Sequence, residues 1–316
     1  MQRTLALERR RVVHATKIVH LHGAHARSVR RDGASRQPYN RRSMARIHPS
    51  AVVLGEVTLA PDAEIGPFCV IEGCPGPVVI GAGTRLLHRV SVQGPCTIGE
   101  RNTMHPGVTL GFPPQDLGFS PAEPGPGLVI GDENVFREGV TIHRGKTHAP
   151  TRVGHRNYFM VNSHAGHDCI IGNHNIFANG TLLAGHVEVA DRVITGGNAT
   201  VHQFCRVGRG AFVGGLTGFS LDLPPFFMVT GINIAGSINV VGMRRSGMSR
   251  SDIDTVKWVY KVLQRSQLPK AAKLEELRTR AGDPVVDEYI AFVESAKRGI
   301  VPGEGTVMRG SASQME

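Results

Sequence analysis

The fold is decided by residues 153–219, which read VGHRNYFMVNSHAGHDCIIGNHNIFANGTLLAGHVEVADRVITGGNATVHQFCRVGRGAFVGGLTGF. An apolar residue returns at every sixth position of this stretch, with Thr195 as the one polar exception. The series is Val153, Phe159, Ala165, Ile171, Phe177, Leu183, Val189, Thr195, Val201, Val207, Val213 and Phe219. A short unit repeated at fixed spacing indicates a solenoid rather than a globule packed around one centre.

The same period extends toward the N-terminus. It runs from Ile47 to Ile71, resumes at Ile80 and continues to Ile142 with interruptions. A unit of six residues is one short strand and a turn, and three units make one coil, so residues 18 apart lie above one another. The sequence therefore predicts a mainly β fold, a parallel β-helix over residues 47–225. The period does not set the hand of the coils.

Two loops and a change of pattern complete the organisation. The loop at residues 112–128 contains five prolines, which cannot continue a strand ladder, and a shorter loop covers residues 146–152. After residue 225 the hexads give way to helical spacing near residues 251–263, 269–281 and 284–297, with a capping box predicted at Ser251–Asp254. We therefore expect a small helical domain over residues 226–302 and a frayed, Gly/Ser-rich tail over residues 303–316.

The basic charge is confined to the N-terminal tail. The net charge is +10, but residues 1–46 hold twelve basic and two acidic side chains, which leaves 24 of each sign elsewhere. Nucleic-acid binding by the body of the protein is therefore not expected. The tail has two interpretations, an Arg-rich mitochondrial transit segment or a mis-set start with translation beginning at Met44. The second predicts a cytoplasmic protein.

Cysteine usage and hydropathy limit the class of protein. The five cysteines form no CxxC pair and no even-numbered framework, which is typical of buried thiols in a reducing compartment. No apolar run approaches the roughly 20 residues that span a bilayer, so no transmembrane segment is expected.

Histidines gather on one predicted edge of the prism. Subtracting whole coils places His167, His186 and His202 within one residue of the same vertical edge, and His164 lies three residues back on the same corner. Outward polar residues of any β-helix, a zinc site like that of trimeric β-helix carbonic anhydrases, and a general-base histidine are the three interpretations. Asp168 could tune the pKa of His167 only if the corner turns its side chain back, because neighbours in a strand point to opposite faces.

Several motifs resemble one known family. They are Asn162-Ser163-His164-Ala165-Gly166-His167-Asp168-Cys169, Leu183-Ala184-Gly185-His186, Val201-His202-Gln203-Phe204-Cys205, Gln115-Asp116-Leu117, Thr141-Ile142-His143-Arg144-Gly145 and Gly242-Met243-Arg244-Arg245. Over residues 47–300 the chain is similar to the UDP-N-acetylglucosamine O-acyltransferases that open lipid A biosynthesis. The resemblance implies a left-handed β-helix and a homotrimer with active sites between subunits. It also implies transfer of a 3-hydroxyacyl chain from acyl carrier protein to the sugar 3-position, without a cofactor or a metal.

The resemblance also implies roles for individual residues. His167 would be the general base, Asp168 would orient its imidazole, and the N–H of Gly185 would face the developing oxyanion. Gly215 would lie at the end of the acyl groove, where no side chain would block a tail of about 14 carbons. The residues implied in binding the nucleotide sugar or the carrier's arm are Gln115, Asp116, His164, His186, His202, Gln203, Asn239 and Arg245.

Two departures from the family pattern leave the acceptor open. Gly118 stands where members commonly have Lys after Gln-Asp-Leu, and Ser246 stands where many have a further Arg. Both lost charges would lie near the nucleotide or the carrier. A 3-amino analogue of the sugar therefore remains an alternative acceptor. Basic residues at 257–273 would suit an acidic carrier protein, or simply form a solvated helix face.

Overall fold

The computed structural model describes residues 44–303 of the chain, which fall within one compact unit. The tail expected over residues 1–46 lies outside the described residues up to residue 43. The tail expected over residues 303–316 lies outside them from residue 304 onward. In the part that is described, no helix is both long and apolar enough to cross a membrane.

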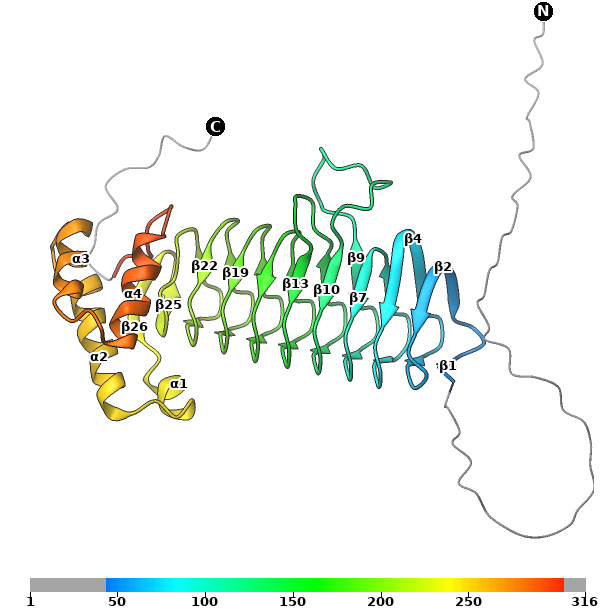
Figure 1. Cartoon of the computed structure of the whole chain (residues 1–316), viewed down its shortest axis with the longest axis horizontal. Helices are drawn as coiled ribbons and strands as arrows, with labels where there is room; N and C mark the ends of the chain where they lie inside the picture. Colours follow the sequence, from blue (N-terminus) through cyan, green and yellow to red (C-terminus); the bar gives the residue numbers. More distant parts are fainter. Residues whose placement is uncertain (1–43, 304–316) are drawn as a thin grey trace, which may run out of the picture. The chain divides into compact units, whose positions relative to one another are not determined.

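The chain winds into an elongated solenoid of parallel strands (Figure 1). One face is an eleven-stranded sheet of β1 Arg46–Ile47, β3 Glu64–Ile65, β5 Arg85–Leu86, β8 Thr103–Met104, β11 Val135–Phe136, β14 Tyr158–Phe159, β17 Ile176–Phe177, β20 Ile194–Thr195, β23 Phe212–Val213, β25 Phe227–Gly231 and β26 Ile234–Ile238. All of its pairs are parallel except the terminal β25–β26 hairpin.

The other two faces form one continuous fifteen-stranded sheet because β4 Val70–Ile80 turns a corner and pairs on both. The first face holds β7 Cys96–Ile98, β10 Leu128–Ile130, β13 Thr151–Val153, β16 Ile170–Ile171, β19 Glu188–Val189 and β22 Arg206–Val207. The second holds β6 Ser91–Gln93, β9 Thr109–Phe112, β12 Thr141–His143, β15 His164–Ala165, β18 Leu182–Leu183, β21 Thr200–Val201 and β24 Gly218–Phe219, while β2 Val52–Leu59 pairs with β4.

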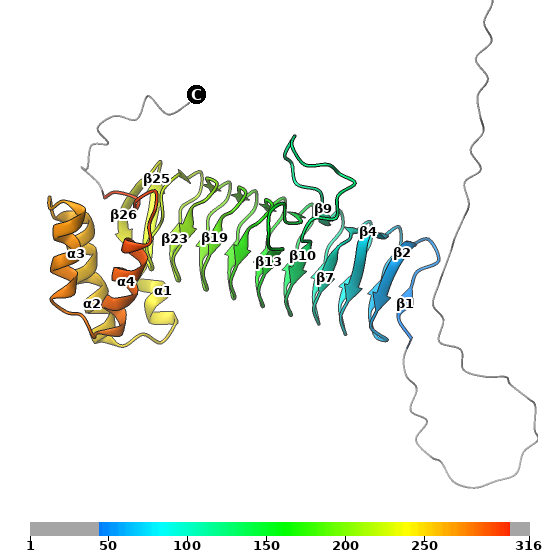
Figure 2. The same ribbon diagram turned by 45° about the horizontal axis from the view of Figure 1, so that its top comes forward.

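The predicted register is confirmed in the regular part of the solenoid. Tyr158 pairs with Ile176 and Ile176 with Ile194, a spacing of 18 residues. The spacing grows to 32 between Thr103 and Val135 and to 23 between Val135 and Tyr158, since these coils carry the two loops. Figure 2 shows the longer loop rising from the solenoid between β9 and β10.

From Ile65 to Phe219 the leading residue of each hexad is buried, and the core runs along the prism, whereas Ile47 in the first hexad is exposed. Phe136, Phe159 and Phe177 stack on successive coils with ring centroids 5.1 and 4.7 Å apart. Thr195, the polar exception, is buried and hydrogen-bonds through its hydroxyl to the Thr181 hydroxyl at 2.7 Å. Its polar atom is therefore satisfied, which is what burial requires.

The C-terminal region packs on the last coils. It contains α1 Val240–Arg245, α2 Arg250–Tyr260 with a π-helical extension η1 Lys261–Arg265, α3 Lys270–Arg278 and α4 Pro284–Glu294. The parallel ladder continues to β25, past residue 225 where the hexads stop. The predicted capping box was wrong, since Ser249 rather than Ser251 caps α2 by accepting from Asp252 N–H at 3.1 Å.

Candidate active site

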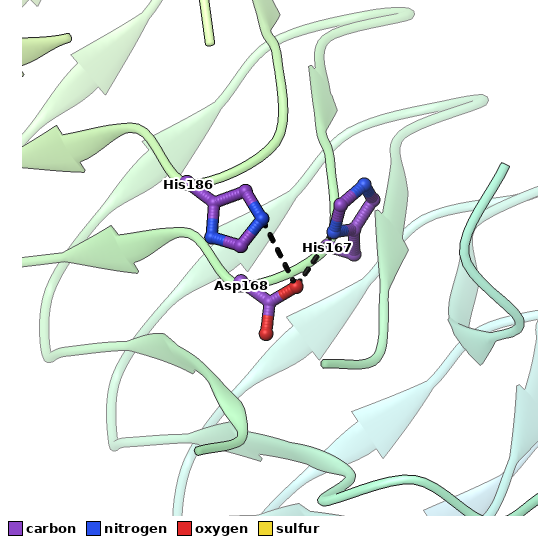
Figure 3. Close-up of side chains that lie close together, drawn as sticks. All are labelled: His167, Asp168 and His186. Carbon is purple, nitrogen blue, oxygen red and sulfur yellow. Dashed lines mark hydrogen bonds and ion pairs between the residues drawn. The ribbon is translucent and has the colours of Figure 1, made fainter. Parts of the chain in front are cut away.

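A histidine–aspartate pair lies at one corner of the solenoid (Figure 3). His167 Nδ1 and Asp168 Oδ2 are 2.6 Å apart, although the two residues are consecutive. Asp168 adopts a left-handed backbone conformation with φ of 60°, which turns its side chain back toward the imidazole. An ionised carboxylate only accepts, so Nδ1 is the donor, and in the neutral form of the ring the lone pair is on Nε2.

The Asp168 carboxylate is held by the loop at residues 146–152. It accepts from the backbone N–H of Lys146 at 3.2 Å, from the N–H of Thr147 at 2.9 Å and from the Thr147 hydroxyl at 2.8 Å. The backbone N–H of Asp168 donates to the Thr151 hydroxyl. Burial acts to raise the pKa of Asp168, but the hydrogen bonds from His167, Thr147 and Lys146 outweigh it, and the pKa is lowered. Asp168 is therefore ionised near neutral pH.

The next coil supplies two neighbours of His167. His186 meets the His167 ring edge-on at 5.2 Å, places Nε2 3.7 Å from Asp168 Oδ2, and stacks on Phe204 at 4.4 Å. Burial is the main cause that lowers the pKa of His186. Gly185 lies against the imidazole, since a Cβ built there would be 2.9 Å from His167 Nε2. Within residues 44–303 its backbone N–H finds no acceptor.

A second histidine pair, His164 on the same coil and His143 on the preceding one, extends the site. His164 Nδ1 lies 2.7 Å from the Thr141 hydroxyl, and its ring meets His143 edge-on at 5.0 Å. Burial lowers the pKa of His164, and it lowers the pKa of His143 to about 4. The Nδ1 atom of His143 is buried and lacks a hydrogen-bond partner among the described residues. Both rings are therefore neutral at pH 7.

Neutral burial of His143 predicts a pH-dependent stability. Its pKa is about 4 when folded and 6.5 in the unfolded chain, so between these values the unfolded state binds more protons. This contribution is complete above pH 6.5 and is lost as the pH falls toward 4. We expect His143 to reduce the free energy of unfolding by about 2 kcal/mol between pH 7 and pH 5.

Denaturant unfolding of the protein and of His143→Asn at both pH values measures this term. On acidification from pH 7 to pH 5 the variant should lose about 2 kcal/mol less of its free energy of unfolding than the parent. His164 also destabilises the fold at low pH, but it is present in both proteins, so its contribution cancels in the difference. His174→Asn, which changes an exposed histidine, serves as the control and should track the parent. Equal losses for the parent and for His143→Asn would contradict the expectation.

The loop at residues 112–128 is anchored by a buried arginine. Arg144 is fully buried and donates to Gln93 Oε1 and to the carbonyl oxygens of Gly111, Pro121 and Glu123 at 2.8–3.1 Å. Its guanidinium also lies 5.7 Å from the Phe119 ring centroid. Because Pro121 and Glu123 belong to the loop, Arg144 fixes the loop that carries Gln115 and Asp116 to the solenoid.

Asp116 is brought to the site by an ion pair. Its Oδ2 accepts from Lys146 Nζ at 2.6 Å, and its Oδ1 accepts from the N–H of Gly118 at 2.8 Å. The hydrogen bond from Lys146 is the main cause that lowers the Asp116 pKa, and His167 contributes. Gln115, beside it on the same loop, is exposed.

The remaining predicted residues do not touch the pair. His202 and Gln203 are exposed one coil beyond His186, and Gly215 is exposed at another corner. Arg245 is exposed in the last turn of α1. Asn239 departs from its expected role: it is buried, caps α1 by accepting from Gly242 N–H at 2.8 Å and donates to the Gly210 carbonyl at 2.9 Å. Both the oxygen and the nitrogen of its side-chain amide are therefore used in hydrogen bonds within the protein.

A groove of about 450 Å³ opens beside the pair. Its lining includes Asp168, His186 and Phe204 of the solenoid and Lys297 and Arg298 of the C-terminal region. The ligating atoms of His167, Asp168 and His186 lie within 4.8 Å of one another, which would suit a metal ion. However, His167 Nδ1 and both Asp168 oxygens already serve in hydrogen bonds, which favours an acid–base pair.

Sequence reasoning missed the residues that support the pair. Lys146, Thr147 and Thr151 hold Asp168, Arg144 holds the proline-rich loop, and Phe204 stacks on His186. The loop at residues 146–152 was recognised as an insertion. No spacing rule predicts which of its backbone groups meets a carboxylate 22 residues away.

Residues 222–301 match the family described as UDP-N-acetylglucosamine O-acyltransferase, domain 2. The chain is 41% identical over 259 residues to the acyl-[acyl-carrier-protein]--UDP-N-acetylglucosamine O-acyltransferase of Anaeromyxobacter dehalogenans (strain 2CP-1), covering 80% of this chain and 98% of the relative. It is 41% identical over 267 residues to the Halorhodospira halophila protein of the same name, covering 82% and 100%.

Solved structures give the same result. The structure of the Francisella novicida UDP-N-acetylglucosamine acyltransferase superimposes with a TM-score of 0.78 at 35% identity, covering 84% of this chain and all of that one. The predicted left-handed parallel β-helix with C-terminal helices is thereby confirmed. Identity and coverage at this level along nearly the whole of each relative show that the chain belongs to the UDP-N-acetylglucosamine O-acyltransferase family.

Proposed function

We propose that this protein transfers a 3-hydroxyacyl chain from acyl carrier protein to the 3-hydroxyl of UDP-N-acetylglucosamine, the first step of lipid A biosynthesis. Family membership supports the reaction class. The observation that carries the mechanism is the 2.6 Å contact between His167 Nδ1 and Asp168, which leaves Nε2 free to accept a proton. The relatives' names do not favour the carbonic anhydrase alternative.

In the proposed reaction, His167 Nε2 takes the proton of the sugar hydroxyl as its oxygen attacks the thioester carbonyl carbon. The ionised Asp168 stabilises the imidazolium that forms. Collapse of the tetrahedral intermediate breaks the carbon–sulfur bond, and the departing thiolate recovers the proton from His167. Atoms and charges balance without a cofactor.

The oxyanion of the intermediate needs a donor near His167. We assign this role to the backbone N–H of Gly185, which is unpaired among the described residues and belongs to a residue whose Cα lies against the His167 ring. A donor fixed in advance stabilises charge that develops only in the transition state. The absence of a side chain at residue 185 leaves room for the thioester.

The neutral histidines and the loop acid suit a sugar acceptor. We place His164, His186, Gln115 and Asp116 around the N-acetylglucosamine. His202, Gln203 and Arg245 then remain for the nucleotide or for the carrier's arm. Exposure of these last three leaves them free to meet a ligand or a second copy of the chain. Asn239 is left out of this set because its side chain is used in capping α1.

A homotrimer is the proposed assembly. Large apolar side chains stand exposed on the solenoid, Ile170 and Leu182 on strands next to the site and Leu216 at another corner, and neighbouring copies would cover them. Light scattering in solution should give three times the chain mass of 34.0 kDa. A mass of one chain at the concentrations used for assay would contradict this assembly.

The cytoplasm is the proposed compartment. All five cysteines are unpaired, which fits a reducing environment. Fractionation of cells that express the full chain tests this, and enrichment with mitochondria would instead support the transit-segment interpretation of the N-terminal tail.

The test of the function is a direct assay of the full-length protein. UDP-N-acetylglucosamine is incubated with 3-hydroxyacyl carrier proteins of about 10 to 18 carbons, and the product is identified by mass spectrometry. We expect an ester product, formed fastest with about 14 carbons because Gly215 presents no side chain. An amide formed only with the 3-amino sugar would change the acceptor, and no product with either acceptor would refute the proposal.

A further inference from the structure

Lys146 joins the two inserted loops at the active site. Its backbone N–H donates to Asp168 at 3.2 Å, while its side-chain Nζ donates to Asp116 Oδ2 at 2.6 Å. One residue therefore contacts both the carboxylate that supports the general base and the carboxylate predicted to hold the sugar. Neither the motifs nor the predicted site residues include it.

The ammonium of Lys146 retains the capacity to bind a ligand. An ammonium has three N–H donors, and among residues 44–303 only Asp116 is found to accept from this one. The side chains of both partners are 32% exposed, so the ion pair is partly open to solvent and can be reached by a ligand. With Gly118 N–H on the other oxygen, the Asp116 carboxylate is held in one orientation.

The position of this positive charge accounts for one departure from the family pattern. Gly118 stands two residues after Asp116, where the family resemblance led us to expect Lys. Lys146 supplies a cation to the same carboxylate from the opposite loop. A cation therefore lies at Asp116 although residue 118 is Gly.

We propose that Lys146 is the acceptor-binding cation of this enzyme: it orients Asp116 and donates a remaining N–H to a hydroxyl or phosphate oxygen of the nucleotide sugar. This role rests on the proposed function. Lys146 acts on binding of the acceptor rather than on proton transfer, because its contact with Asp168 is made by the backbone N–H, which Lys146→Met keeps.

The experiment is steady-state kinetics of full-length Lys146→Met. Loss of a charge-assisted hydrogen bond should raise the KM for UDP-N-acetylglucosamine about tenfold or more, with kcat within about threefold and the KM for the acyl donor unchanged. Calorimetric binding of UDP-N-acetylglucosamine without donor should weaken by a similar factor. The control is Arg156→Ala, which removes an exposed cation paired with Glu133 at another corner and should leave both constants unchanged.

A second variant tests whether a lysine at residue 118 can replace the ammonium of Lys146. A Cβ at Gly118 would meet only Asp116 Oδ1, at 3.2 Å, and this oxygen ends a side chain that can yield slightly. The double variant Gly118→Lys, Lys146→Met should have a KM for UDP-N-acetylglucosamine at least threefold lower than that of Lys146→Met alone. An unchanged KM in Lys146→Met, or a fall in kcat alone, would overturn the assignment. No product from the parent would refute the proposed function instead, and the calorimetric comparison would still decide on Lys146.

Discussion

Replacing His167 by Ala is expected to lower kcat about a thousandfold, because a positioned general base contributes roughly 10²–10⁴ to such a reaction. The side chain is the only imidazole found hydrogen-bonded to Asp168 in the described chain, at 2.6 Å, with Nε2 left free. His186 cannot take over directly, since its Nε2 lies 3.7 Å from Asp168 and its ring is stacked on Phe204. The measurement is the rate of ester formation with both substrates saturating.

The same assay needs a variant that removes a histidine elsewhere. His155→Ala is suitable because His155 pairs with Asp132 at a different corner and should retain the parent rate. Circular dichroism and thermal unfolding establish that each variant is folded. If His167→Ala works within tenfold of the parent, another group takes the proton and the mechanism fails.

Replacing Gly185 by Ala is expected to cost about a hundredfold in kcat. The added methyl would lie 2.9 Å from both Cε1 and Nε2 of His167, closer than carbon atoms tolerate, so the imidazole must move. A displacement of about 1 Å at a catalytic group can cost 10²-fold. The methyl also occupies the space beside the unpaired N–H proposed to bind the oxyanion. The rate of ester formation and the binding of UDP-N-acetylglucosamine should be measured together.

Gly231→Ala is the matched control, because a Cβ there would meet only Ile234 Cδ1, at 3.8 Å. It should keep the parent rate. The Gly185 variant should remain folded, since residue 185 does not require a left-handed backbone. A Gly185→Ala enzyme with the parent kcat would show that neither the N–H nor the space beside His167 matters.

The solenoid could be predicted because its physics is periodic. Each hexad buries its leading residue against the coils above and below, and the series from Val153 to Phe219 records that burial. Thr195, although polar, is also buried at its expected position, where its hydroxyl forms a hydrogen bond with the Thr181 hydroxyl. Coil arithmetic also brought His167 and His186 together, as the structure does.

The support of the site could not be predicted in the same way. Whether Asp168 reaches His167 depends on one backbone angle, the φ of 60° at the corner, which residue spacing does not record. The contacts of Lys146 and Arg144 depend on loop paths that have no period. The start of α2 was misplaced by two residues because Ser249 and Ser251 are equally good caps in sequence, and only the chain path chooses between them.

The loop contacts have a consequence for folding fidelity. In a chain of similar coils, a strand can pair with the wrong neighbour, one coil too early or too late, with little loss of buried apolar surface, because successive coils have similar core residues. The bonds from Lys146 and Thr147 to Asp168, and from Arg144 to the proline-rich loop, exist in one alignment only. The residues that build the corner proposed as catalytic therefore also distinguish the correct stacking of the coils, and a mis-stacked molecule would lack the His167–Asp168 site as described.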